Sequence, residues 1–169
     1  LGSLLGGRLA ERTARPLLWY GLAEIGVGLV ALRLASALEG LAPLLRAAYP
    51  DGSAAGGWRY QALRILLAGG ALLLPTTLMG ATLPLVLKHF VRSRSVLGEM
   101  GAYFYAVNTL GALAGTLAVG FALLPYLGMS RSTWCAAAIN LGIGTVCVGL
   151  GWRSALPRLA TGASRPELD

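Results

Sequence analysis

The sequence predicts an all-α protein, a polytopic bundle of transmembrane helices. Of its 169 residues, 56% are hydrophobic and 12% are charged, and the mean hydropathy is +0.67. Soluble domains usually contain about 25% charged residues. The 24 glycines fit close helix packing in lipid, where small residues let backbones approach.

Apolar segments long enough to cross a bilayer define the predicted elements. A helix needs about 20 residues to span roughly 30 Å of hydrocarbon. Four complete spans are predicted at about 17–36, 61–87, 101–124 and 133–152, and residues 1–7 look like the end of a partial span. The chain opens without methionine, so we expect a piece of a longer or trimmed chain. Residues 1–152 form the predicted transmembrane domain, and 153–169 form a tail.

Basic residues predict the orientation, because Lys and Arg near span ends accumulate on the cytoplasmic side. They concentrate in the first connection, the third connection and the tail: Arg8, Arg12, Arg15, Lys88, Arg92, Arg94, Arg153, Arg158 and Arg165. We therefore expect a multi-pass protein of the bacterial inner (cytoplasmic) membrane with a cytoplasmic tail. The net charge of +7 follows this topology rather than one basic face, so no nucleic-acid partner is expected. The expected partners are the lipid bilayer and other membrane protein subunits.

Glu24 is the most informative single residue, because an ionisable side chain inside a span is costly and suggests function. It lies eight residues after Pro16, about 12 Å along a helix. Counting the same depth on the other spans predicts a polar layer of Glu24, Thr77, Asn108 and Thr145. The layer fixes helix packing, holds a proton or substrate, or turns toward another subunit, and the sequence leaves these readings open.

Other residues in the spans have structural interpretations. Pro75 and Pro84 predict kinks in one helix, since each removes a backbone donor. Gly111, Gly115 and Gly120 predict close helix packing. Gly142 and Gly144 also indicate a packing surface. Cys135 and Cys147 lack the paired spacing of a metal site, so we expect no metal and no cofactor.

Two phrases carry a family resemblance. They are Pro-Thr-Thr-Leu-Met-Gly-Ala-Thr-Leu-Pro at 75–84 and Tyr-Ala-Val-Asn-Thr-Leu-Gly-Ala at 105–112, supported by Gly-Phe-Ala-Leu-Leu-Pro at 120–125. With them the chain resembles the membrane domain of bacterial spermidine synthase-like proteins, also described as fused major facilitator and spermidine synthase proteins. The resemblance runs over residues 1–152.

A second run resembles the cytoplasmic loop signature of major facilitator transporters. Residues 7–15 read Gly-Arg-Leu-Ala-Glu-Arg-Thr-Ala-Arg, so Gly7, Glu11, Arg12 and Arg15 match or nearly match it. Glu11 replaces the usual Asp, and Ala14 replaces the second Gly. The resemblance implies a fold like part of a major facilitator half, with the partial first span as the second helix and one helix upstream.

Fused relatives carry a synthase-like domain expected to transfer an aminopropyl group from decarboxylated S-adenosylmethionine to a polyamine. This sequence has no strand and Gly-rich turn followed by an acidic residue, so that domain is absent from it and we expect no enzyme. Three functions remain open. The first is a non-catalytic anchor, scaffold or accessory subunit. The second is a transporter or half-transporter, and the third is the membrane domain of a polyamine aminopropyltransferase-type enzyme with a separate catalytic part.

Overall fold

The chain is helical throughout the residues that the computed structural model describes, which are 1–48, 57–91 and 97–153. This confirms the all-α prediction. The elements in chain order are α1 (Gly2–Arg12), α2 (Pro16–Ala48), α3 (Trp58–Phe90), α4 (Leu97–Ala118), η2 (Val119–Leu123) and α5 (Leu124–Arg153).

Three apolar stretches are long enough to cross a membrane: Pro16–Leu34, Tyr60–Phe90 and Leu97–Arg153. The prediction of four complete spans is therefore corrected. The expected spans 101–124 and 133–152 fall within one apolar stretch of 57 residues, Leu97–Arg153, which is helical on both sides of a non-helical residue, Gly128. The helix α2 also continues to Ala48, well past the predicted end at residue 36.

The long third stretch changes direction at Gly128. This residue has φ 73° and ψ 175°, a conformation that glycine adopts without the Cβ clash of other residues. The Ser132 hydroxyl donates a hydrogen bond of 2.7 Å to the Gly128 carbonyl, which satisfies one acceptor at the bend. Just before it, η2 is a π-helical turn in which the Leu124 N–H bonds the Val119 carbonyl. Pro125 follows directly and lacks the N–H that would continue a regular α-helical ladder.

The region around the first connection is more helical than the loop signature predicts. Gly7, Glu11 and Arg12 lie inside α1, and the chain leaves the helix at Thr13, whose backbone is extended. Arg15 lies in the short connection and precedes Pro16, the first residue of α2. A residue before proline disfavours the α conformation, whereas proline itself suits a first helical position. These preferences confine the connection to residues 13–15.

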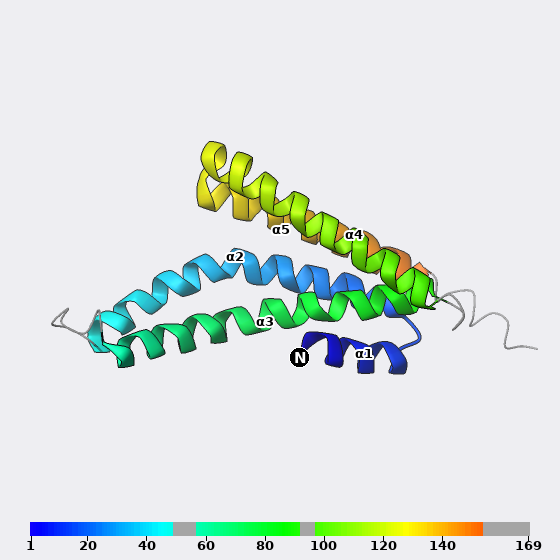
Figure 1. Cartoon of the computed structure of the whole chain (residues 1–169), viewed down its shortest axis with the longest axis horizontal. Helices are drawn as coiled ribbons and strands as arrows, with labels where there is room; N and C mark the ends of the chain where they lie inside the picture. Colours follow the sequence, from blue (N-terminus) through cyan, green and yellow to red (C-terminus); the bar gives the residue numbers. More distant parts are fainter. Residues whose placement is uncertain (49–56, 92–96, 154–169) are drawn as a thin grey trace, which may run out of the picture.

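The helices pack as a linear series in which α1 contacts α3, α3 contacts α2, and α2 contacts α5. Figure 1 shows α2 and α3 along the long axis, with α1 below α3 and the α4–η2–α5 arm above α2. The tip of this arm stands away from α2. The helix α4 buries none of its residues, and its main contacts are with α3 and η2.

The contact between α1 and α3 uses small residues. Gly2, Gly6 and Ala10 are buried on α1 at four-residue intervals. A Cβ placed on Gly6 would lie 2.7 Å from the carbonyl oxygen of Ala81, and one placed on Gly80 would lie 3.1 Å from the Cα of Gly2. Part of the proline-flanked phrase at 75–84 therefore forms a surface for close backbone packing.

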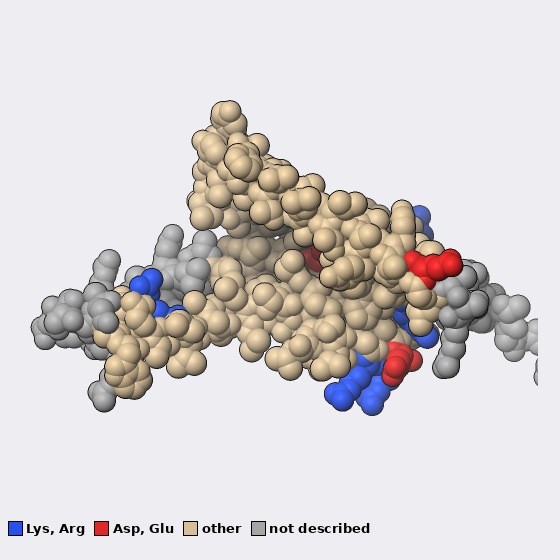
Figure 2. Space-filling model, viewed as in Figure 1, with Lys and Arg blue, Asp and Glu red and all other residues tan. Residues whose placement is uncertain are grey.

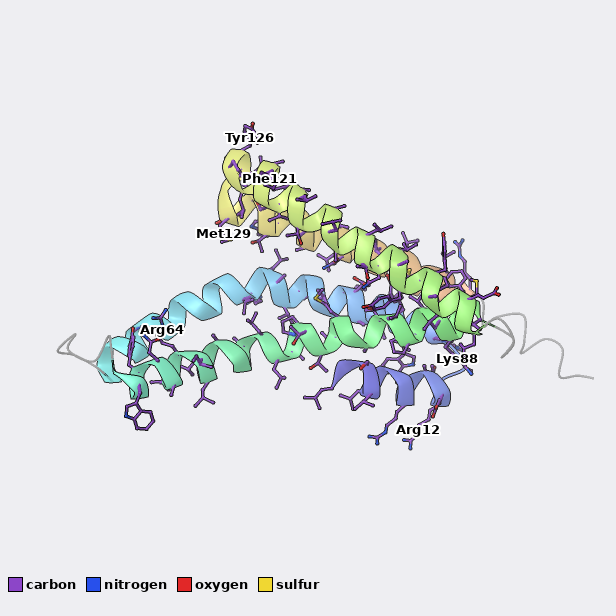
Figure 3. The ribbon with its side chains drawn as sticks, viewed as in Figure 1. Arg12, Arg64, Lys88, Phe121, Tyr126 and Met129 are labelled. Carbon is purple, nitrogen blue, oxygen red and sulfur yellow. The ribbon has the colours of Figure 1, made fainter. Side chains whose placement is uncertain are left out.

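Lys and Arg side chains gather near the ends of the molecule. Figure 2 shows Lys and Arg atoms near both ends and none in the middle region of this face, where a small patch of acidic atoms is visible. In Figure 3, Arg12 and Lys88 lie at one end and Arg64 lies at the other, while Phe121, Tyr126 and Met129 lie at the tip of the arm. Phe121 is 78% exposed and Tyr126 is 82% exposed, so the tip presents bare apolar and aromatic surface.

Candidate functional site

Small residues form the contact surface between α2 and α5. Ala137, Gly144 and Gly151 are buried on α5, one every seven residues. Gly21 and Gly28 are buried on α2 and are also seven residues apart. A seven-residue repeat keeps one face of a helix turned toward its neighbour. We call these five residues the small-residue seam.

The backbones meet directly along this seam. A Cβ on Gly21 would lie 2.6 Å from the carbonyl oxygen of Gly144, and a Cβ on Gly144 would lie 2.7 Å from the carbonyl oxygen of Gly21. A Cβ on Gly151 would lie 2.7 Å from the backbone nitrogen of Leu18. Residues early in α2 thus meet residues late in α5, so the helices run antiparallel. The prediction that Gly144 is a packing residue is confirmed, whereas a Cβ on Gly142 would meet nothing within 4 Å.

A polar group lies beside the seam. Tyr20 and Glu24 are one helical turn apart on α2, so their side chains lie on the same face of the helix. Cys147 lies on the facing helix, within electrostatic range of Glu24. All three side chains are partly buried. This polar group is the candidate site.

The surface near the seam is hollowed. Figure 2 shows a hollow between the α4–η2–α5 arm and the layer of α2 and α3, with acidic atoms at the inner end of its floor.

The other members of the predicted polar layer lie in different surroundings. Thr77 is partly buried on α3, and its carbonyl oxygen faces Gly2 of α1. Asn108 is exposed on α4. Thr145 is exposed on α5, and its hydroxyl donates to the Leu141 carbonyl at 2.6 Å. The four-residue layer stays a prediction, and one neighbour of Glu24 on its own helix face is Tyr20.

The predicted packing glycines of α4 and η2 have no neighbour in the described part of the chain. A Cβ on Gly111, Gly115 or Gly120 would meet nothing within 4 Å. Their role in packing stays a prediction, since it requires a neighbour beyond the described residues.

The proline kinks also stay a prediction. Pro75 and Pro84 lie inside α3, which is assigned as one helix from end to end. The Thr76 hydroxyl donates to the Leu72 carbonyl at 2.7 Å. The carbonyl that Pro75 frees is that of Ala71, four residues before it. The threonine therefore bonds a neighbouring carbonyl rather than the freed one.

Sequence reasoning missed both partners of Glu24. Tyr20 could have been found, because a tyrosine four residues before a carboxylate shares its helix face. Cys147 could not, because its approach depends on the register between α2 and α5. The described residues contain no group of three or more His, Cys, Asp or Glu that could hold a metal ion.

The chain is similar to two proteins that are both named polyamine aminopropyltransferase. The chain is 33% identical over 143 residues to polyamine aminopropyltransferase 2 of Streptomyces coelicolor. The aligned region covers 84% of this chain and 25% of that protein. It is 44% identical over 68 residues to a polyamine aminopropyltransferase of Corynebacterium efficiens. This aligned region covers 38% of this chain and 13% of that protein. No protein-family model matches the chain. No solved structure matches it significantly.

These relatives correct one expectation and support another. Both are named for an enzymatic transfer reaction, so the expectation that this protein is not an enzyme is wrong. The resemblance to spermidine synthase-like proteins gains support over part of the chain. The chain spans a quarter of the Streptomyces relative and less of the Corynebacterium one.

Proposed function

We propose that this chain is the membrane-embedded helical part of a polyamine aminopropyltransferase-type protein, with the transfer chemistry carried by residues outside this sequence. The observation that carries the proposal is the relationship to the Streptomyces protein, which extends over most of the chain rather than over one motif. The transferred group would be an aminopropyl group, and the acceptor would be a polyamine.

The helical architecture supports this role. Three apolar stretches are long enough to cross a bilayer, and seams of small residues join α1 to α3 and α2 to α5. Helices joined by such close backbone contacts suit an anchor that holds a catalytic part at a membrane surface. The sequence of α2 contains two acidic residues, Glu24 and Glu39, and the sequences of α3 and α5 contain none.

The distribution of charge supports an orientation. Arg12 and Lys88 share one end of the bundle, and α5 ends at Arg153 near the same end (Figures 1 and 3). Positive charge at helix ends favours the cytoplasmic side. We therefore place this end at the cytoplasmic face of the bacterial inner membrane, where soluble donor and acceptor molecules are available.

A deletion strain tests the proposal. Washed membranes from the parent strain should transfer labelled aminopropyl groups from decarboxylated S-adenosylmethionine to 1,4-diaminobutane, and membranes lacking this chain should not. Total activity in the soluble fraction serves as the control, because loss of an anchor releases activity without destroying it. Equal membrane-bound activity in both strains would refute the proposal.

A further inference from the structure

The helix α1 turns two arginines away from its neighbour. Gly2, Gly6 and Ala10 are the buried residues of α1, and this helix packs on α3. Arg8 and Arg12 are exposed, and each lies two residues, about 200°, from a buried small residue. They are one turn apart and therefore share the face opposite α3. Figure 3 shows Arg12 pointing away from α3.

Exposed leucines precede the arginines on this outward face. Leu1, Leu4 and Leu5 are 78%, 68% and 53% exposed. They lie one to two turns before Arg8. Along α1 the outward face is therefore apolar first and carries two guanidinium groups afterwards.

The contact with α3 sets the depth of these side chains. A Cβ on Gly6 would lie 2.5 Å from the Cα of Ala81, and α1 and α3 run in the same direction (Figure 1). Arg12 therefore lies near the level of Lys88, in the last turn of α3. Arg8 lies one turn, about 6 Å, deeper. At that depth the charged end of an arginine extends toward the headgroup layer, while its stem stays in apolar surroundings.

An anionic phospholipid matches this face in both charge and polarity. Its phosphate accepts bidentate hydrogen bonds from guanidinium groups, and its acyl chains suit the exposed leucines. Figure 2 shows Lys and Arg atoms gathered at this end with acidic atoms beside them. Glu11 offsets one positive charge and Lys88 adds one, so the three cations and one acid leave a net charge of +2. A lipid with net negative charge is therefore favoured over a zwitterionic one.

We infer that Arg8 and Arg12 bind the phosphate of an anionic phospholipid in the cytoplasmic leaflet, with its acyl chains on the leucines of the outward face. The inference rests on the membrane placement and orientation proposed above. It goes beyond them by assigning a lipid site to one face of one helix.

Native mass spectrometry of the full chain in detergent, titrated with phosphatidylglycerol, measures the association constant of the first bound lipid. This constant should fall about fivefold in Arg8→Gln and in Arg12→Gln, and about twentyfold in the double variant. Glu11→Gln should raise it, because the substitution removes the neighbouring acid. The charge-matched control combines Arg64→Gln with Arg131→Gln, which removes two exposed arginines from other parts of the chain and should leave the constant unchanged.

Inorganic phosphate at matched ionic strength should not displace the lipid, because it has no acyl chains for the leucines. The inference is overturned by unchanged binding in the double variant, by an equal loss in the control, or by displacement with inorganic phosphate. Extraction of host membranes with alkaline carbonate separates the two proposals. A chain that stays in the membrane but binds phosphatidylglycerol no better than phosphatidylcholine refutes only the lipid site, whereas a chain released by carbonate refutes the membrane placement itself.

Discussion

The small-residue seam predicts a large penalty for adding one methyl group at Gly144. In Gly144→Ala the new Cβ would lie 2.7 Å from the Gly21 carbonyl oxygen, about 0.7 Å short of the 3.4 Å at which ordinary contact begins. The new Cβ would also lie 2.9 Å from the backbone nitrogen of Ile25, so rotation of the Ile25 side chain cannot relieve the clash. Overpacking of this kind costs about 1–3 kcal/mol.

Gly149→Ala is the matched control. Gly149 lies on the same helix, is exposed, and has nothing within 4 Å of an added Cβ. Both substitutions gain about 0.8–1 kcal/mol of helix propensity. The difference between the two variants therefore isolates the steric cost, and Gly144→Ala should be less stable by about 1–3 kcal/mol.

Reversible unfolding in mixed micelles, followed by tryptophan fluorescence, measures this difference. The free energy of unfolding should fall for Gly144→Ala and stay level or rise for Gly149→Ala. Equal stability of the two variants would refute the described contact between α2 and α5.

Further predictions concern α1, the bend and the topology. Gly6→Ala should destabilise the protein by about 1–3 kcal/mol relative to Gly7→Ala in the same unfolding assay, because only Gly6 contacts another backbone; equal values would contradict the α1–α3 packing. Gly128→Ala should cost about 1–2 kcal/mol because of its positive φ, and an unchanged free energy of unfolding would refute the bend. In a chain without native cysteines, a membrane-impermeant maleimide should label Arg64→Cys in intact spheroplasts and Arg153→Cys only in inverted vesicles; labelling of both on one side would contradict the orientation.

The sequence was sufficient for the helical class and for the approximate positions of the apolar segments. Hydrophobicity along the chain determines both properties, and each is local. The boundaries were less predictable because helices extend into polar sequence, as α2 does to Ala48 and α1 does through Arg12. The bend at Gly128 falls inside the connection predicted between the spans 101–124 and 133–152.

The candidate site was only partly predictable. Glu24 stands out in the sequence because it is a charge inside an apolar segment. Its neighbours depend on which small-residue helix face packs against another helix. The four-residue spacing of Gly111 and Gly115 looks more convincing in the sequence than the seven-residue spacing of Gly144 and Gly151, yet the second pair makes the close contacts. Spacing identifies surfaces capable of packing, whereas the register between helices decides which of them pack.

The most direct test of the proposed function is the activity of the isolated protein. The chain, carrying an affinity tag, would be purified gently from membranes of its own host together with whatever remains bound. The eluate would receive isotopically labelled decarboxylated S-adenosylmethionine and 1,4-diaminobutane, and mass spectrometry would follow the acceptor. We expect the mass of the acceptor to increase by one labelled aminopropyl group in this eluate and to stay unchanged in a mock purification. An eluate that contains the chain and its companions but forms no such product would contradict it.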